Sequence, residues 1–93
     1  MADNTKLRSI LVTGSGSGIG LAIARRLAAP GVGMTIHALT NREGCERTKR
    51  EVEAAGAEAQ IVLGDLADEA FAREIVDRTA EAFGGLDVLV ANA

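Results

Sequence analysis

The sequence predicts an α/β fold in which helices cover one parallel sheet, and three observations support this prediction. Four short, mainly aliphatic segments alternate with three longer segments whose apolar residues recur at helical spacing. The 93-residue chain is 47% hydrophobic but only 2% aromatic, so Val, Ile, Leu and Ala must build the core, as is typical of buried parallel strands. Glycine follows each predicted helix within two residues. We therefore expect successive strand–helix–strand units with right-handed crossovers.

The first half of the chain is expected to form a strand, a helix and a second strand. Residues 9–12 are a mainly aliphatic run after a short polar lead. A helix is expected over 18–29, and Pro30 with Gly31 ends it because proline cannot continue the helical hydrogen bonds. Alternating residues then predict a strand over 33–39. The apolar face of the helix is expected at Ile19, Ala22, Ile23 and Leu27.

The second half is expected to add two helices and two strands. A helix over 43–55, ended by Gly56, is charged on most faces and has only a thin apolar stripe. A strand over 59–63 follows, and residues 68–83 form the clearest amphipathic helix of the chain. A last strand is expected over 86–91. The apolar faces of the two helices are expected at Cys45, Val52 and Ala55, and at Phe71, Ile75, Val76, Thr79 and Phe83.

The order of these units predicts the strand order 3-2-1-4. Two units extend outward from the first strand, and one returns past it. The direction of the sheet therefore reverses beside the first strand, and open α/β sheets bind ligands at the carboxyl ends of the strands at such a reversal. The chain is long enough for one domain and too short for two, so we expect no second domain.

A glycine-rich loop over 13–20 connects the first strand to the first helix. A helix N-terminus has unpaired N–H groups and a partial positive charge, and glycines let the backbone approach a phosphate closely enough to use them. Gly14 would allow the tight turn, Gly18 the close approach, and Gly20 the packing of the helix against the strand behind it. The alternative is a flexible turn that happens to be rich in glycine. The strand before the loop and the helix after it favour a pyrophosphate cradle.

Three motifs occur in order on the predicted elements: a Thr-Gly-Xaa-Xaa-Xaa-Gly-Xaa-Gly loop, an Asp-aliphatic pair after the third strand, and Asn-Ala after the fourth. Together they resemble the classical short-chain dehydrogenase/reductase family and cover the N-terminal part of its larger fold. The resemblance implies a Rossmann-type parallel sheet, with residues 1–93 as the N-terminal portion of a dinucleotide-binding domain. A finer similarity is to 3-oxoacyl-[acyl-carrier-protein] reductases. The matching residues are Thr13, Gly14, Gly18, Ile19, Gly20, Asp65, Leu66, Asn92 and Ala93.

The resemblance implies an NAD(P)-dependent oxidoreductase that transfers hydride between a nicotinamide and a carbonyl or alcohol. It also implies how the dinucleotide is held. Asp65 could instead be a carboxylate that the dipole of the next helix favours, and Asn92 could instead make a strand-end hydrogen bond in the sheet. The implied contacts are Gly14, Ser17 and Ile19 along the pyrophosphate and adjoining ribose, Asp65 and Leu66 at the adenine, and Asn92 beside the adenosine half.

The residues after the second strand favour NADP over NAD as the cofactor. NAD-binding chains usually carry a carboxylate at the end of this strand, whereas a 2′-phosphate requires Arg or hydroxyl donors. Leu39 occupies the position of the carboxylate, and Thr40, Asn41 and Arg42 follow it. Many NADP-preferring relatives have a basic residue where this loop has Ser17, which leaves Arg42 to meet the phosphate. Alternatively, Arg42 is an exposed residue that begins the second helix.

The chain contains no tyrosine, so no catalytic residue is assigned. The family uses a Tyr, a Lys and a Ser that follow the fourth strand, and a general acid must lie within hydrogen-bond reach of the reacting oxygen. We therefore expect the 93 residues alone to be inactive. One alternative is a non-catalytic, stand-alone NADP-binding or regulatory module. Another is a Rossmann-type flavin binder, which the spacing from Gly14 to Gly18 disfavours.

Single residues of other chemically active types are expected to be structural. His37 lies within the second strand, where a packed or hydrogen-bonded histidine is far commoner than a catalytic one. Cys45 is the single cysteine and has no companion at metal-ligand spacing, so we expect neither a disulfide nor a metal site.

Charge and hydropathy exclude several partners. The net charge is −3, and lysines and arginines alternate with acidic residues, which argues against nucleic acid. No apolar run is long enough to span a membrane or form a signal-peptide core, so we expect a cytoplasmic protein. The hydrophobic fourth strand would lie at an edge of the sheet. Such an edge invites pairing with another chain, so we expect a homo-oligomer that uses this edge and the helix over 68–83.

Overall fold

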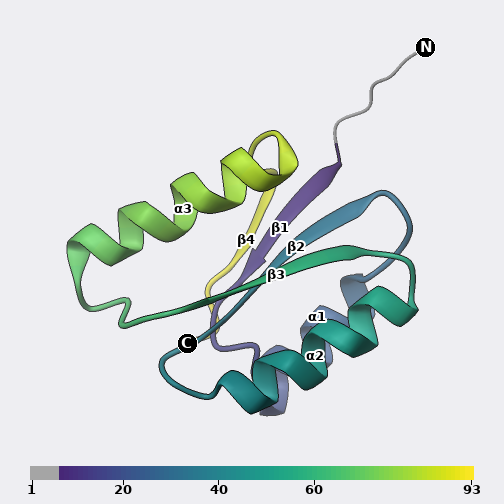
Figure 1. Ribbon diagram of the computed structural model, residues 1–93, viewed down its shortest axis with the longest axis horizontal. Coiled ribbons are helices and arrows are strands. Elements are labelled where there is room, and N and C mark those ends of the chain that lie inside the picture. Colours follow the sequence, from purple (N-terminus) through teal and green to yellow (C-terminus); the bar gives the residue numbers. More distant parts are fainter. Residues whose placement is uncertain (1–6) are drawn as a thin grey trace.

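A computed structural model describes residues 7–93 as one parallel sheet with helices on both faces (Figure 1). Residues 1–6, the polar lead before the first strand, lie outside the described residues. The strand order is β3-β2-β1-β4 with all pairs parallel, which confirms the predicted order and the Rossmann-type architecture. The elements are β1 (Arg8–Val12), α1 (Gly18–Leu27), β2 (Val32–Ala38), α2 (Arg42–Ala54), β3 (Glu58–Leu63), α3 (Glu69–Phe83) and β4 (Val88–Val90).

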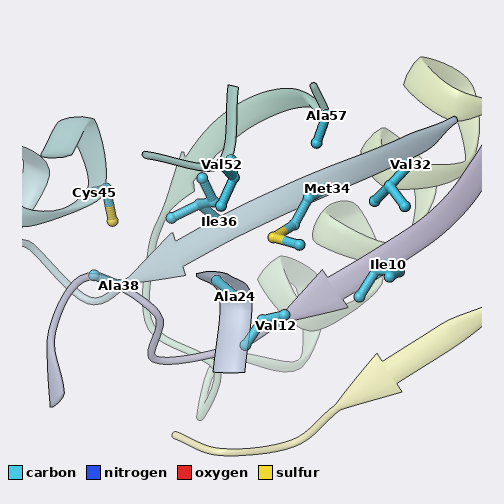
Figure 2. Packing of buried hydrophobic residues seen from close by; sticks show 10 residues of the cluster. All are labelled: Ile10, Val12, Ala24, Val32, Met34, Ile36, Ala38, Cys45, Val52 and Ala57. Atoms are coloured by element: carbon cyan, nitrogen blue, oxygen red, sulfur yellow. The ribbon is translucent and has the colours of Figure 1, made fainter. Parts of the chain in front are cut away.

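The helices divide between the two faces of the sheet: α1 and α2 cover one face, and α3 crosses the other (Figure 1). The larger hydrophobic cluster lies under α1 and α2, and Figure 2 shows its ten buried side chains. A smaller cluster of Leu11, Val62 and Ile75 lies under α3. Successive residues of β1 thus alternate between the faces, since Ile10 and Val12 join the first cluster and Leu11 joins the second.

β2 is the most deeply buried strand, because all seven of its residues are buried. Its neighbours on both sides are strands, and it lies between helices on both faces. A methyl group on Gly33 would overlap the ring of Phe83 at the end of α3, so glycine allows this close packing. These contacts hold β2 firmly in the sheet, so the position of the carboxyl end of β2 is well defined.

The first helix ends earlier than expected, and two residues of its expected apolar face, Ile19 and Ala22, are exposed. It stops at Leu27 rather than at residue 29, because Ala28 is extended (φ −70°, ψ 132°) and the residue before Pro30 avoids helical geometry. Ile19, expected on the buried face, is 73% exposed, but Ile23 and Leu27 pack against the core as expected, beside the buried Leu21 and Ala24.

The last strand is also shorter than expected, at Val88–Val90 instead of 86–91. Asp87 explains why β4 begins at Val88. The Asp87 carboxylate accepts a hydrogen bond from the Ser9 N–H at 2.8 Å, a position that a backbone carbonyl of a longer β4 would otherwise occupy. In α3, Ile75, Thr79 and Phe83 are buried as expected, but Val76 is 38% exposed.

Candidate functional site

In the glycine loop after β1, Gly14 makes the tight turn that the sequence predicts, whereas the atoms nearest to Gly20 belong to Gly14 and Asn92 rather than to the strand behind the helix. Gly14 has φ of +63°, which permits the tight turn, and a methyl group on Gly20 would overlap the Gly14 carbonyl. The start of α1 therefore packs directly on the loop. Gly18 has φ of +60°, and a methyl group there would meet nothing within 4 Å. The space that a close ligand would need is thus open at Gly18.

The N-terminus of α1 is left without a side-chain cap. Ser17, its N-cap residue, makes no side-chain capping bond, and the first turn has no acidic residue. By contrast, Asn41 caps α2 through Gly44 N–H, and Asp68 caps α3 through two N–H groups. The first helical bond of α1 runs from Leu21 N–H to the Ser17 carbonyl at 3.2 Å. Among the helices of residues 7–93, α1 alone therefore presents uncapped N–H groups and an uncompensated dipole to an anion.

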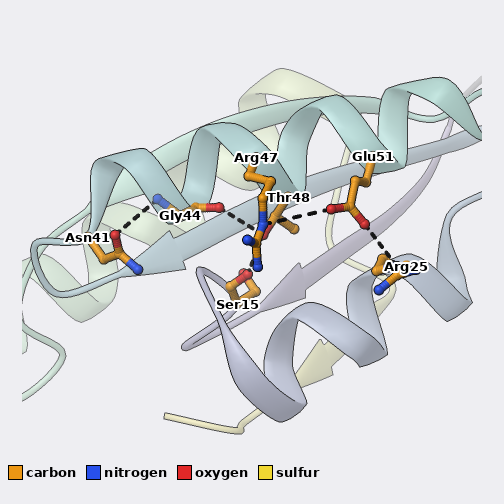
Figure 3. Close-up of polar contacts among 7 residues, drawn as sticks. All are labelled: Ser15, Arg25, Asn41, Gly44, Arg47, Thr48 and Glu51. Atoms are coloured by element: carbon orange, nitrogen blue, oxygen red, sulfur yellow. Dashed lines mark hydrogen bonds and ion pairs between the residues drawn. The ribbon is translucent and has the colours of Figure 1, made fainter.

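Ser15 fixes the loop from inside, a role that the sequence did not reveal. Its hydroxyl donates to the Val12 carbonyl at 2.8 Å and accepts from the His37 N–H at 3.0 Å. Its own N–H donates to the His37 carbonyl at 2.7 Å. The Ser15 carbonyl accepts from the Thr48 hydroxyl of α2 at 2.8 Å (Figure 3). An ion pair between Arg25 and Glu51, 2.9 Å long, further joins α1 to α2.

His37 is hydrogen-bonded and buried, as its position within a strand predicts. Its Nδ1 accepts from the Gly14 N–H at 3.0 Å, and its Nε2 lies 2.9 Å from the Gly64 carbonyl. The side chain therefore joins the glycine loop to the end of β3, a connection that sequence analysis did not anticipate.

Asn92 makes the strand-end hydrogen bond that was the alternative to a cofactor contact. Its side-chain NH₂ donates to the Gly14 carbonyl at 3.1 Å. Its backbone N–H donates to the Thr13 hydroxyl at 2.9 Å, and the Ala93 N–H reaches the same oxygen at 3.1 Å. These contacts hold the end of β4 against the glycine loop. A contact between Asn92 and a cofactor stays a prediction.

Asp65 does not cap α3, since Asp68 accepts from the Ala70 N–H at 2.9 Å and the Phe71 N–H at 3.3 Å. One oxygen of Asp65 accepts from the Ala67 N–H at 2.9 Å. The exposed carboxylate lines a pocket instead.

That pocket, of about 320 Å³, lies at the carboxyl ends of β1, β2 and β3. It brings together five of the predicted site residues: Gly14, Ser17, Asn41, Asp65 and Leu66. Gly18, Ile19, Gly20, Thr40, Arg42 and Asn92 do not line it. The remaining lining residues are Gly16, His37, Ala38, Leu39, Gly64 and Ala93.

The basic residues near the pocket come from α2. Arg42 begins this helix and lines a separate groove of about 490 Å³ together with Lys49 and Gln60. Arg47 lines a hollow of about 350 Å³ that also includes Ser17 of the glycine loop, and Arg42 does not line this hollow. The sequence pattern singled out Arg42 and not Arg47, which lies five residues further along α2.

The remaining reactive groups do not form a site. Burial raises the pKa of the Cys45 thiol above its ordinary value of 9.0, and the nearby Arg42 guanidinium lowers it by a smaller amount. The thiol is therefore neutral near pH 7 and is a poor nucleophile. Within residues 7–93, no group of three or more His, Cys, Asp or Glu side chains could hold a metal ion. No helix in that range has both the length and the apolar character to cross a bilayer.

A family model, curated relatives and solved structures all match this chain. The family model for short chain dehydrogenase matches residues 8–93. The chain belongs to the short chain dehydrogenase family. The chain is similar to General stress protein 39 of Bacillus subtilis (strain 168), with 39% identity over 99% of this chain and 32% of that protein.

Two further relatives also match most of this chain but only about a third of their own length. A protein named as a ketoacyl reductase of granaticin polyketide synthase, from Streptomyces violaceoruber, is 46% identical over 89% of this chain and 32% of its own length. The crystal structure of a short chain dehydrogenase from Burkholderia cenocepacia J2315, in complex with NADP, has a TM-score of 0.86 and 46% identity. It matches 92% of this chain and 35% of its own. The chain thus spans about a third of the length of these relatives.

Proposed function

We propose that residues 1–93 are the N-terminal portion of the dinucleotide-binding domain of an NAD(P)-dependent oxidoreductase. The uncapped N-terminus of α1, next to the open space at Gly18, is the observation that supports this proposal most directly. The bound nicotinamide would supply hydride exchange with a carbonyl or alcohol. The residues of this chain would bind and orient the dinucleotide at the carboxyl edge of the sheet.

The proposed contacts follow the geometry of the site. The N–H groups at the start of α1 would bind the pyrophosphate, and the 73% exposed side chain of Ile19 is available to the adjoining ribose. The adenine would enter the 320 Å³ pocket, whose lining includes Asp65 and Leu66. The full set of proposed contacts is Gly14, Ser17, Gly18, Ile19, Gly20, Thr40, Asn41, Arg42, Asp65, Leu66 and Asn92.

NADP is the proposed cofactor, with NAD as the alternative. The relative from Burkholderia cenocepacia binds NADP in its crystal structure. In this chain the end of β2 carries no carboxylate, since Leu39 and Thr40 follow the strand, and α2 begins with Arg42. A 2′-phosphate would find a guanidinium donor there.

Substitution of Arg42 tests the choice of cofactor. Arg42→Ala is expected to raise the Kd for NADP⁺ about tenfold and to leave the Kd for NAD⁺ unchanged, because only NADP⁺ offers a phosphate to the guanidinium. Isothermal titration calorimetry is the suitable measurement, since the chain has no Trp or Tyr for intrinsic fluorescence. Arg73→Ala, on the opposite face of the sheet, is the matched control. An NADP⁺ preference that survives Arg42→Ala and disappears in Arg47→Ala would contradict the role of Arg42.

The second candidate function is a module that binds NADP without chemistry. The absence of tyrosine from all 93 residues favours it for this chain taken alone, since no described side chain can serve as the family's general acid. We propose accordingly that the chain alone binds the dinucleotide but does not oxidise NADPH in the presence of a ketone. Turnover by the purified chain would overturn that part of the proposal.

We also propose that the protein is cytoplasmic and assembles with itself. A single buried cysteine suits a reducing compartment. Among the strands of residues 7–93, β4 pairs with β1 alone, and Leu89 on it is 55% exposed. Together with Val76 of α3, Leu89 borders an apolar hollow of about 300 Å³. Edge strands of this kind pair readily with a second chain.

A further inference from the structure

We propose that His37 is a positioning residue of the cofactor site, whose neutral ring holds the glycine loop and the end of β3 together and whose protonation releases them. Dinucleotide binding would then weaken as the pH falls. The inference rests on the proposed function, because it assigns a regulatory property to the same site. It begins from two hydrogen bonds, Gly14 N–H to Nδ1 at 3.0 Å and Nε2 to the Gly64 carbonyl at 2.9 Å.

These two bonds determine the protonation state of the ring. A backbone N–H can only donate, so Nδ1 must carry a lone pair toward Gly14. A carbonyl can only accept, so Nε2 must carry the proton toward Gly64. The ring is therefore the neutral Nε2–H tautomer. Protonation would place a hydrogen on Nδ1 as well as on Nε2, directed at the Gly14 N–H, and one of these two groups would have to move.

The surroundings leave the ring little room to avoid that conflict. His37 is 3% exposed, and its ring centroid lies 5.9 Å from that of Phe71 on α3. Its backbone is fixed as well, because its N–H and carbonyl both bond to Ser15. The conflict would therefore displace Gly14 or Gly64 rather than turn the ring away.

Both of these glycines belong to the proposed cofactor site. Gly14 begins the loop that leads to the α1 N-terminus, and Gly64 directly precedes Asp65 and Leu66 in the lining of the pocket. His37 itself lines the same pocket. A movement at either end of the ring would thus change the shape of the surface that receives the adenosine and pyrophosphate.

Few other ionisable groups surround the ring. Asp65, after β3, is the one other ionisable side chain in the lining of the pocket among the described residues. α3 presents Phe71 to the ring, and the nearest acidic residue before it, Asp68, caps that helix. The glycine loop and the neighbouring residues of β1 and β2 contribute none. A positive ring could also attract the cofactor's phosphates and tighten binding, so the direction of the pH effect is itself a test.

Calorimetric titrations of the full chain with NADP⁺ at a series of pH values from about pH 8 to about pH 5.5 measure this direction. His37→Asn keeps an acceptor near the Nδ1 position but cannot be protonated, and His37→Gln keeps a donor near the Nε2 position. The 2′-phosphate of free NADP⁺ also titrates in this range, and this contribution is the same for every variant. The Kd of the wild type is expected to rise about tenfold more than that of His37→Asn, as loss of about one hydrogen bond predicts.

Equal pH dependence in the wild type and His37→Asn, or tighter wild-type binding at low pH, would overturn the proposal. If His37→Asn fails to fold, His37→Gln is compared in its place, and it too should lose the pH dependence.

Nuclear magnetic resonance of the cofactor-free chain tests the link between His37 protonation and Gly14 separately from the proposed function. His37 is the single histidine, so its ring ¹⁵N signals need no further assignment. We expect the Nε2–H tautomer near pH 8 and a Gly14 amide shift that follows the titration of the ring. An Nδ1–H tautomer, or a Gly14 amide that ignores the titration, would overturn the proposal. If the His37 and Gly14 signals behave as expected but neither the wild type nor any variant binds NADP⁺, the proposed function is wrong, whereas the link between His37 and Gly14 is confirmed.

Discussion

At the scale of single residues, two buried hydroxyl groups differ in their hydrogen bonding. The Ser9 hydroxyl is fully buried and has no partner within residues 7–93. The Thr79 hydroxyl, equally buried, lies 2.7 Å from the Ile75 carbonyl and 2.8 Å from the Thr35 hydroxyl. A buried polar group without a partner costs free energy, whereas a satisfied one contributes to stability.

Substitutions of Ser9 and Thr79 test this difference in hydrogen bonding. Ser9→Ala is expected to raise the free energy of unfolding by about 1 kcal/mol, and Thr79→Val to lower it by about 1 kcal/mol. Urea unfolding followed by far-ultraviolet circular dichroism measures both. A Ser9→Ala variant that is less stable than the wild type would show that the hydroxyl has a partner.

At the scale of the elements, the connection between β1 and α1 depends on two glycines for different reasons. Gly20 leaves no room for a methyl group, because the Gly14 carbonyl occupies that space. Gly18 has the room but adopts a left-handed backbone (φ +60°), which costs another residue about 1 kcal/mol.

Gly20→Ala is therefore expected to lower the free energy of unfolding by about 3 kcal/mol, since a rigid backbone atom must move. Gly18→Ala is expected to lower it by only about 1 kcal/mol while weakening NADP⁺ binding, because the methyl group projects into the ligand's space. Thermal unfolding and calorimetric titration of both variants measure the two effects. Equal destabilisation by the two substitutions would contradict the packing of α1 on the loop.

The elements show which features a sequence can predict. Strand–helix alternation, the strand order and the turn at Gly14 were predictable, because they depend on local pattern and on glycine's conformational freedom. The exposure of Ile19 was not, since hydrophobic spacing placed it on the same face as Ile23 and Leu27, which do pack against the core. The bonds from Thr48 to Ser15 and from His37 to Gly64 were not predictable either, because they join residues 33 and 27 positions apart. Nothing in the spacing of these residues distinguishes them from ordinary strand and helix residues.

At the scale of the whole molecule, β4 has a strand neighbour on one side alone within residues 7–93, and we expect self-association through its other side. Leu89→Lys places a charge on this edge and is expected to convert an oligomer of the wild type into a monomer, because charged edge strands resist pairing. Leu39→Lys is the matched control, since Leu39 is a comparably exposed leucine (60%) that lies after β2 rather than on the edge strand. Analytical ultracentrifugation measures the outcome. A wild-type chain that sediments as a compact monomer would contradict the expectation.

The hydrogen bonds from Asn92 to Thr13 and Gly14 also bear on how the protein is made. Asn92 follows Thr13 by 79 positions, so the ribosome synthesises the glycine loop long before it supplies the partner that holds it. Contacts between such distant positions form late in folding, because the intervening chain must first lose its conformational freedom. A nascent chain would thus hold an incomplete loop, and affinity for a nucleotide would arise only after β4 has joined the sheet.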